Sequence, residues 1–459
     1  MSEITLPVAV PALGLRAKGS IRSAAVTAAL WMVFAGNMGA IFGIWLSHGG
    51  VSSVVNLGTA IQSTGRITGL LAGYFVLIQV ALLVRIPWLE RRVGFDRLTV
   101  WHRRNGKLSL VLVLIHVVAI TVGYAMVDGI SIPTEISQFL AYYPWMIAAI
   151  IGTVLMILVV AESLVIVRRK LPYESWYLVH LTAYLAIALG WFHQIPTGFD
   201  LTTHATAALY WTGLYVGTLV LLLGFRFALP FLQGLRRGLR VREVVPEARD
   251  VVSVIMTGRR LDRMNVRAGQ FMLFRFMDRR RCWESHPFSI SALPESDTLR
   301  ITVKGVGGFS RGLRDLKPGT WVLGEGPYGV FTAASARRER VLLIAGGIGI
   351  TPIRTLMEEL QGDIVVLWRV RSEDDIILRA ELEELASRRR IRLEYLVGDH
   401  ADPNMRHLLS TENIRSLVPD VDQREVYLCG PPAMTSLVQR AIKAAGTPDR
   451  HVHSEKFAL

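Results

Sequence analysis

The sequence predicts a multi-domain membrane protein: an all-α bundle of six transmembrane helices, then an antiparallel β-barrel and a doubly wound α/β domain. Three observations carry this prediction. The chain has 459 residues, more than one hydrophobic core usually organises. Long apolar runs dominate before residue 233, whereas short strand and helix patterns rich in charge follow it. Four histidines lie within two of the apolar runs, where ionisable side chains are rare because their dehydration is costly.

Six apolar runs are long enough to cross about 30 Å of hydrocarbon at about 1.5 Å per residue. Their expected bounds are 24–46, 66–89, 103–126, 145–167, 173–194 and 206–230. Lysine and arginine crowd the segment before the first run and the second and fourth connections, and they are absent from 47–65, 127–144 and 195–205. The positive-inside rule therefore places both termini in the cytoplasm.

The composition disfavours two other classes of protein. The net charge of +14 would suit a protein that binds nucleic acid. However, the basic residues gather at the ends of apolar runs and form no single basic stripe. The only two cysteines, Cys282 and Cys429, lack the spacing of metal ligands. We therefore expect no nucleic-acid partner, no zinc site and no disulfide framework, and we expect contact with membrane lipid.

The four histidines form two pairs at matching depths. The pairs are His102 with His116 in the third run and His180 with His193 in the fifth. A separation of 14 residues is about 21 Å of rise and returns to within roughly 40° of the same helix face. A separation of 13 leaves the side chains roughly 140° apart, so we expect rewinding near Gly190 or fraying before Pro196.

Neutral imidazole is a good axial ligand for haem iron, so we interpret the four histidines as metal ligands of two haems. Hydrogen bonding within the bundle and a proton relay are the alternatives. Relays usually also recruit Asp or Glu, and the fourth and fifth runs offer only Glu162 and Glu174, near the membrane faces. At the outer end of the second run, Arg66 either snorkels to lipid phosphate or neutralises a haem propionate or an oxygen-derived anion.

Short strands separated by turn residues predict the small barrel between Val241 and about Ser335. Within it, Phe288 of the segment 286–291 (HPFSIS) could stack on a flat ring, and Ser289 could hydrogen-bond a ring nitrogen or carbonyl. The segment 304–310 (KGVGGFS) precedes an expected helix and could present backbone N–H groups to a pyrophosphate. Each segment alone is equally compatible with an ordinary strand or turn.

The last domain begins with a buried strand, VLLIA, followed directly by the glycine turn Gly346–Pro352 and a helical segment. A strand, a glycine turn and a helix N-terminus together bind phosphate, because small residues let a dinucleotide approach the backbone. The alternative is a tight connection without a ligand. Strand and helix patterns continue to alternate after the turn, as in a doubly wound parallel sheet, and this order favours binding.

Together these motifs resemble the ferric reductase and NADPH oxidase superfamily, particularly its bacterial members, from about residue 24 onward. The second half looks like a ferredoxin-reductase-type module. The resemblance implies that His102, His116, His180 and His193 ligate two b-type haems, with Arg66 beside the outer one. The implied domains are a cytoplasmic segment at 1–23, the transmembrane haem domain at 24–232, the FAD-binding barrel at 241–335 and the NAD(P)H-binding domain at 336–459.

The resemblance also assigns residues to the nucleotide cofactors. For FAD they are His286, Pro287, Phe288, Ser289, Ser291, Lys304, Gly307, Gly308, Phe309 and Ser310. For NAD(P)H they are Gly346, Gly347, Gly349, Thr351, Pro352, Cys429, Gly430 and Pro431. Phe457 matches the C-terminal aromatic that shields the flavin until nicotinamide displaces it. Ser289, Phe457 and Arg66 are the expected catalytic residues.

Three positions depart from the superfamily's pattern. A frequent Asp after the pyrophosphate glycine is Gly308 here, and a histidine that the oxidases often place one turn beyond the outer ligand is Ile120. Asp399 stands where NADPH-preferring relatives often carry Arg. A carboxylate there would repel the 2′-phosphate of NADPH, whereas Arg369 and Arg371 offer it positive charge. We expect a lean to NADH.

The implied function is that of a NAD(P)H-dependent flavocytochrome b oxidoreductase in a bacterial plasma membrane. Electrons would pass from cytoplasmic NAD(P)H through FAD and two haems to an external acceptor, a ferric iron complex or dioxygen. FAD is needed because hydride carries two electrons and haem accepts one. The expected partners are a small-molecule donor and acceptor, and no obligate protein partner is evident. The alternatives are a six-span proton channel or haem sensor fused to a flavin reductase, and a membrane-anchored flavin reductase serving a cytoplasmic partner.

Overall fold

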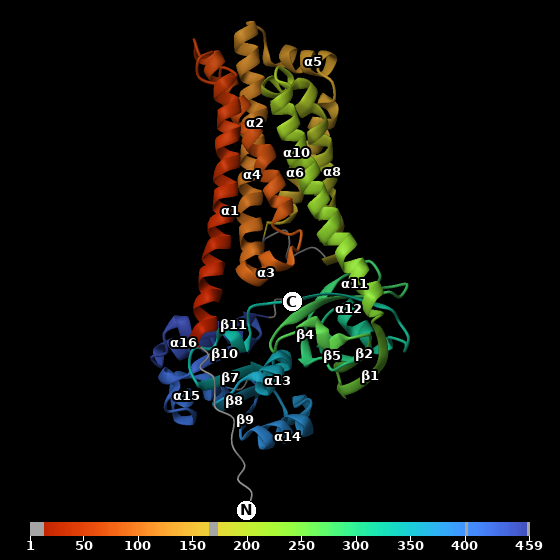
Figure 1. The fold of residues 1–459 in the computed structure, drawn as a ribbon, viewed down its shortest axis with the longest axis vertical. Helices are drawn as coiled ribbons and strands as arrows, with labels where there is room; N and C mark the ends of the chain where they lie inside the picture. Colours follow the sequence, from red (N-terminus) through yellow and green to blue (C-terminus); the bar gives the residue numbers. More distant parts are fainter. Residues whose placement is uncertain (1–12, 165–172, 400–402, 457–459) are drawn as a thin grey trace, which may run out of the picture. The chain divides into compact units, whose positions relative to one another are not determined.

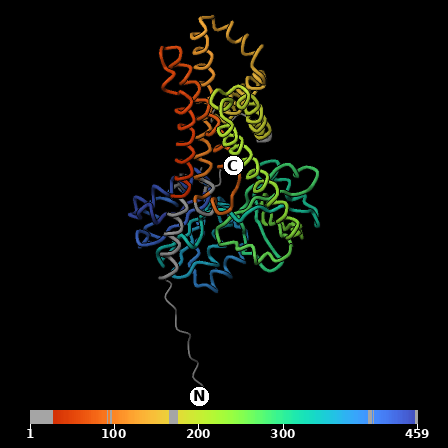
Figure 2. Tube along the Cα trace, turned by 45° about the horizontal axis from the view of Figure 1, so that its top comes forward, coloured from red at the N-terminus to blue at the C-terminus, as the bar shows by residue number. Residues whose placement is uncertain are grey.

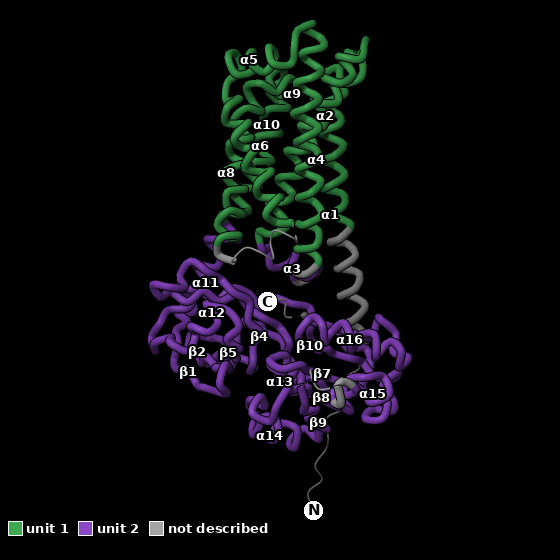
Figure 3. The backbone as a smooth tube through the Cα atoms, turned by 180° about the vertical axis from the view of Figure 1, so that it is seen from behind, with its two compact units in different colours: residues 1–84, 96–223 green, residues 85–95, 224–459 purple. Residues whose placement is uncertain are grey.

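The structure, a computed structural model, describes residues 13–164, 173–399 and 403–456 and divides into two compact units (Figures 1 and 3). The first unit lies within the residues up to Val84 and from Asp96 to Leu223. Its helices are α1 (Leu13–Ser47), α2 (Leu57–Ala81), α4 (Phe95–Asp128), α5 (Ile132–Tyr142), α6 (Met146–Glu162), α8 (Tyr173–Thr197), α9 (Phe199–Thr202) and α10 (Ala205–Leu221). Within this unit α1 runs beside α2 (Figures 1 and 2).

Five helices in the described part of the chain are long and apolar enough to cross a membrane. Helices α5 and α6, bent by 115°, make a sixth span if they form one broken crossing. The expected bounds of the second run were wrong at both ends. Asn56 caps α2 by accepting a hydrogen bond from Thr59 N, so the helix begins at Leu57. It ends at Ala81, and the rest of the run forms a separate helix, α3 (Pro87–Val93), which starts at a proline.

Three glycines at four-residue intervals give α2 a strip without side chains: Gly65, Gly69 and Gly73. A Cβ atom on Gly69 would lie 2.5 Å from His116 Nδ1 on α4, and one on Gly73 would lie 2.7 Å from the Trp211 ring on α10. Only glycine permits contacts this close, and small residues at such spacing are what membrane helices use to approach one another. The strip therefore brings the α4 histidine against the backbone of α2.

The second unit comprises Arg85–Phe95 and the chain from Gly224 on. After α11 (Leu229–Arg237) it forms a six-stranded antiparallel sheet in the order β1-β2-β5-β4-β3-β6. The strands are β1 (Arg240–Ala248), β2 (Val251–Thr257), β3 (Phe271–Phe276), β4 (His286–Ala292), β5 (Thr298–Lys304) and β6 (Val322–Tyr328), with the short helix α12 (Gly308–Arg311) between the last two. The β1 and β6 ends are joined by a bridge between Arg240 and Trp321 and by a hydrogen bond from Val322 N to Leu239 O at 2.9 Å.

A five-stranded parallel sheet follows, in the order β11-β10-β7-β8-β9. Its strands and helices alternate as β7 (Arg340–Gly346), α13 (Ile350–Glu359), β8 (Asp363–Val370), α14 (Arg379–Arg389), β9 (Arg392–Val397), α15 (Thr411–Leu417), β10 (Glu425–Gly430), α16 (Pro432–Ala444) and β11 (Val452–Lys456). On β7, Val341 and Leu343 join a core with α13 and α14, and Leu342 and Ile344 join one with α15 and α16. Both faces are covered, as expected of a doubly wound sheet.

The two sheets of this unit are joined by buried hydrogen bonds. Gly269 N, before β3, donates to Thr355 Oγ1 at 2.9 Å, and Ala268 N donates to Glu359 Oε2 at 2.8 Å. Both acceptors belong to α13, which also packs against β4 (Figure 1). The strand with the HPFS segment and the helix that follows the glycine turn are therefore neighbours.

Helix α3 packs on β6 through a cluster of charged side chains. Arg85 forms an ion pair with Glu325 on β6. Glu90 on α3 is only 3% exposed, and among the described residues its Oε2 has no hydrogen-bond partner. Burial raises the pKa of Glu90 to about 7; Arg85 opposes this rise, Glu325 adds to it and Arg226 opposes it.

Gly69→Ala should destabilise the first unit by about 1–3 kcal/mol, because the new methyl group overlaps the His116 ring. The matched control is Gly217→Ala on α10, where an added Cβ meets nothing within 4 Å. Thermal unfolding of both variants in one detergent measures the difference. Equal melting temperatures would contradict the close packing of α2 on α4.

Replacing Glu90 with Gln should weaken the pH dependence of stability. Folded Glu90 holds its proton up to about pH 7 whereas the unfolded chain releases it at lower pH, so wild-type stability falls as the pH rises from about 5 to 8. Relative to wild type, the variant should gain roughly 2–3 kcal/mol across this window. Denaturant unfolding followed by circular dichroism at both pH values tests this, with the exposed Glu295→Gln as control. A stability difference that is the same at both pH values would refute it.

Candidate functional site

The structure brings the predicted inner histidines together across two helices. The rings of His102 on α4 and His180 on α8 have their centres 6.2 Å apart, with planes inclined at 53°. Two imidazoles that bind one iron through nitrogens at about 2 Å have ring centres roughly 6 Å apart. The pair therefore fits a metal ion between the rings. A haem brings four nitrogens of its own, so two imidazoles complete its iron.

Both histidines of α4 are oriented by backbone carbonyls of α2. His102 Nδ1 lies 3.0 Å from Gln79 O, and His116 Nδ1 lies 2.7 Å from Gly65 O. A carbonyl can only accept, so each Nδ1 carries the proton and each Nε2 keeps a lone pair. Histidines that ligate a metal are usually held in this way through their other nitrogen.

The hydrogen bonds of His102 and His116 to α2 follow the same residue spacing on both helices. His116 follows His102 by the same 14 residues that separate Gln79 from Gly65 on the neighbouring helix. Packing against α2 thus holds two equivalent imidazoles of α4 at levels about 21 Å apart along the helix axis. The sequence predicted the two levels from α4 alone, but gave no sign of the carbonyl partners.

On α8, the two predicted ligands lie on one uninterrupted helix. The helix runs from Tyr173 to Thr197 through Gly190 and Pro196, so the expected rewinding or fraying there was wrong.

Around His180, Trp176 stacks on the ring with centres 5.0 Å apart. His180 Nδ1 faces Ser163 Oγ at 3.4 Å and Glu162 Oε1 at 3.8 Å. A carboxylate behind the second nitrogen of a histidine is a common support for a metal ligand. Among the residues described, no group of three or more His, Cys, Asp or Glu side chains is placed to hold a metal ion.

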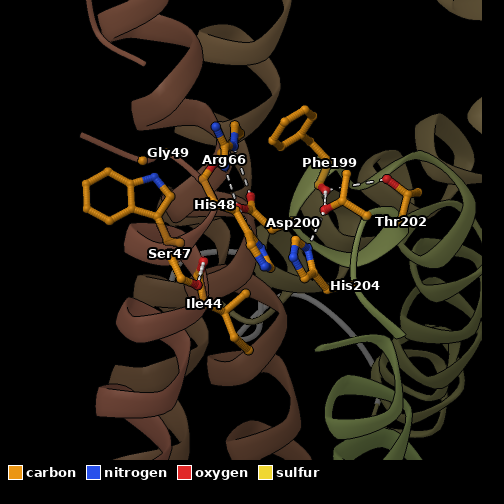
Figure 4. A network of polar contacts seen from close by, with 12 residues as sticks. Ile44, Ser47, His48, Gly49, Arg66, Phe199, Asp200, Thr202 and His204 are labelled. Carbon is orange, nitrogen blue, oxygen red and sulfur yellow. Dashed lines mark hydrogen bonds and ion pairs between the residues drawn. The ribbon is translucent and has the colours of Figure 1, made fainter. Parts of the chain in front are cut away.

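Arg66 has a partner that the sequence analysis did not identify. Its guanidinium binds both carboxylate oxygens of Asp200 on α9, at 3.0 and 2.5 Å, and donates to the carbonyl of His48 at 2.9 Å (Figure 4). The ring of Phe199 lies 4.5 Å from the guanidinium carbon. Asp200 follows Arg66 by 134 residues, so no local pattern could reveal the pair.

In the antiparallel sheet, the HPFS segment forms β4 with Ser289 buried. The hydroxyl of Ser289 has no hydrogen-bond partner among the described residues. Phe309 stacks near both Phe288, at 6.3 Å, and His286, at 3.9 Å between ring centres. A buried hydroxyl without a protein partner is a group that a flavin ring could satisfy. Pro287 is exposed on the same strand.

Two predicted FAD residues have roles within the protein. Ser291 is fully buried, and its Oγ accepts hydrogen bonds from Thr302 Oγ1 at 2.9 Å and from the Arg300 guanidinium at 3.3 Å. Ser310 Oγ accepts from Val306 N and Gly307 N, both at 3.0 Å, and so shapes the glycine loop. Side chains at Gly307 and Gly308 would meet nothing within 4 Å, which leaves that loop open. Lys304 ends β5 opposite Val251.

The glycine turn of the parallel sheet closes tightly on the end of β10. A Cβ on Gly349 would lie 2.3 Å from Cys429 O, and Gly430 lies against Gly346. Gly347 has φ +53° and open space around it, so a ligand can approach its backbone. Thr351 Oγ1 donates to Ile348 O at 3.0 Å, and Pro352 is buried in the first turn of α13.

Cys429 lies at the end of β10, beside the glycine turn, and Pro431 follows as the N-cap residue of α16. Burial raises the pKa of the Cys429 thiol well above its ordinary value, so the thiol stays neutral. Arg369 donates to Val370 O at 2.7 Å and to Leu396 O at 3.0 Å; burial lowers its pKa, and Asp399 opposes this. Arg371 is exposed. Phe457 lies outside the described residues.

Three parts of the chain match known protein families. Residues 68–191 match the family "Ferric reductase like transmembrane component", 237–332 match "FAD-binding domain" and 343–440 match "Oxidoreductase NAD-binding domain". These matches give the chain a ferric-reductase-like transmembrane component, an FAD-binding domain and an NAD-binding domain.

Two curated relatives match parts of the chain. The ferredoxin reductase component of 3-ketosteroid-9-alpha-monooxygenase from Mycolicibacterium smegmatis is 31% identical over 48% of this chain and 65% of its own length. The glycine betaine monooxygenase reductase subunit from Pseudomonas aeruginosa is 32% identical over 37% of this chain and 50% of its own. The chain thus covers about half to two thirds of the length of these relatives.

Among solved structures, the ferredoxin reductase in carbazole 1,9a-dioxygenase aligns with a TM-score of 0.41 and 19% identity, over 48% of this chain and 68% of that one. The order of the three matched families is the one that the sequence motifs predicted. The chain is a fusion of the ferric reductase and NADPH oxidase type, with a ferric-reductase-like transmembrane component followed by a ferredoxin-reductase-type FAD- and NAD-binding module.

Proposed function

We propose that this protein is a flavocytochrome b oxidoreductase that passes electrons from cytoplasmic NAD(P)H through FAD and two b-type haems to an extracytoplasmic acceptor, a ferric iron complex or dioxygen. One observation carries the proposal: His102 and His116 donate their Nδ1 protons to α2 carbonyls in one register. Both Nε2 atoms are thereby left for metal. The 6.2 Å separation of His102 from His180 fits an iron between them.

In this proposal each part of the chain positions one of the cofactors. Bound FAD and haem would supply the conversion from two-electron to one-electron transfer. Phe288 and Ser289 offer a ring and an unpaired hydroxyl to the flavin, and the turn at Gly347 offers open backbone to the dinucleotide. The four histidines would hold the haems. Phe457 and Arg66 keep their expected catalytic roles as part of this proposal.

The proposed location is a bacterial plasma membrane crossed several times, with both termini in the cytoplasm. The distribution of Lys and Arg between the connections supports this orientation. It places the His102 level near the cytoplasm and the His116 level near the outside. The partners in this proposal are a small-molecule electron donor and acceptor and membrane lipid, without an obligate protein partner.

A second candidate is a membrane-anchored flavin reductase that serves a cytoplasmic protein. It is favoured by one observation, the similarity of the second half to reductase components whose names place them with monooxygenases. In that case the histidine pairs would take no part in turnover. The two candidates differ in whether electrons cross the membrane.

Inverted membrane vesicles separate these candidates. With NADH outside and ferricyanide trapped inside, the wild type should reduce the trapped ferricyanide. His116→Ala should lower that rate at least tenfold, because it removes an outer ligand, while NADH-driven reduction of a dye added outside continues. The exposed His407→Ala is the control. Equal rates for trapped ferricyanide in wild type and His116→Ala would exclude the transmembrane route.

The nucleotide site is proposed to prefer NADH. Arg369 is held by two backbone carbonyls, which leaves its charge poorly placed for a 2′-phosphate, and the exposed Asp399 adds a negative charge nearby. We expect kcat/KM for NADH to exceed that for NADPH at least tenfold.

Asp399→Ser should shift this ratio severalfold toward NADPH, because it removes a charge that repels the 2′-phosphate. Asp374→Ser, at another exposed acid of the same domain, should leave the ratio unchanged. Steady-state kinetics with both nucleotides measure the ratio, and a wild-type preference for NADPH would overturn the proposal.

A further inference from the structure

A pocket of about 470 Å³ lies between α1 and the start of α10 in the first unit. Gly43, Ile44 and Ala207 give it an apolar wall, and Ser47, His48 and His204 give it a polar one. Small-molecule sites commonly have this size and this mixed lining. Both helices belong to candidate membrane spans, and Gly43 and Thr206 at the pocket are exposed, so in a membrane the surface around the pocket meets lipid. A ligand can therefore enter from the bilayer.

The polar wall contains two stacked imidazoles. The rings of His48 and His204 have centres 4.0 Å apart and planes inclined at 19°, and they face each other beside Asp200 (Figure 4). The His48 side chain is 7% exposed, and its Nδ1 has no hydrogen-bond partner in the described part of the chain. It lies 3.8 Å from Asp200 Oδ1. An imidazole at the wall of a pocket is a group that can hydrogen-bond a ligand.

The charges beside the pocket select the kind of ligand. Arg66 and Asp200 form a bidentate pair, with side chains 10% and 5% exposed, so their charges cancel locally. The wall consequently offers no net positive charge to an anionic iron chelate or to superoxide. It offers imidazole groups that donate and accept hydrogen bonds and can transfer protons. A neutral, lipid-soluble acceptor with carbonyl oxygens fits both the wall and the route of entry.

We infer that this pocket binds a quinone and is a site where the chain reduces it, with His48 and His204 as the hydrogen-bonding and proton-donating groups. The inference rests on the proposed function for its electrons. NAD(P)H is oxidised to NAD(P)⁺, releasing two electrons and one proton on the cytoplasmic side. The quinone takes up these two electrons, one at a time, and two protons from the imidazoles to become the quinol. Extracytoplasmic water then returns two protons to the histidines.

Binding can be tested without electron transfer. A leucine at position 43 should obstruct the pocket, because Gly43 lines it and an added Cβ there meets nothing within 4 Å. Gly36→Leu on the same helix is the matched control, since an added Cβ there is equally free. Calorimetric titration of the oxidised full chain in lipid nanodiscs with ubiquinone-1 should show at least tenfold weaker binding for Gly43→Leu only. Equal affinity in wild type and Gly43→Leu would overturn the site.

Turnover separates this site from the proposed function. In anaerobic vesicles given NADH, His48→Gln and Gly43→Leu should lower ubiquinol formation at least tenfold and change reduction of trapped ferricyanide less than twofold. Unchanged ubiquinol formation, or an equal loss of both rates, would overturn the quinone site. Absence of trapped ferricyanide reduction in the wild type would instead contradict the proposed function, and the binding titration would still report on the pocket.

Discussion

The hydrogen bonds from two histidines of α4 to the backbone of α2 are the interactions on which the membrane unit depends. His116 reaches Gly65 O because Gly69 carries no side chain, and a single methyl group there would lie 2.5 Å from the ring. His102 uses Gln79 O in the last turn of α2. One helix thereby sets the tautomer, the direction and the vertical spacing of both imidazoles. Neither histidine needs an acidic partner to hold it.

Close packing at glycine also organises the half of the chain that contains the two sheets. Gly349 allows the start of α13 to lie against Cys429 O, which joins the two halves of the turn. Hydrogen bonds from Ala268 N and Gly269 N to α13 then bring that helix beside β4 and the unpaired hydroxyl of Ser289. Under the proposed function the flavin and nicotinamide sites must adjoin for hydride transfer, and this interface would bring them together.

Patterns within short stretches predicted the apolar helices, the paired histidines and the glycine turn, because each is written in local spacing. Contacts between residues far apart in the sequence could not be predicted from local spacing. Asp200 as the partner of Arg66 and the stacking of His204 on His48 arise only once the helices pack. The four-residue interval of Gly65, Gly69 and Gly73 could have predicted a helix-packing face, but the sequence analysis did not use it. Hydropathy misplaced the ends of α2 because capping, which sets helix ends, depends on single polar residues such as Asn56.

The central claim, that the paired histidines hold two haems which receive electrons from the flavin, is tested most directly by optical spectroscopy of the purified full chain. We predict two b-type haems per FAD, both low-spin and both reduced when NADH is added without oxygen. Replacing His102 with Ala should remove one haem and prevent NADH from reducing the other. A preparation that contains FAD without haem, or haems that stay oxidised with NADH while dithionite reduces them, would contradict the account.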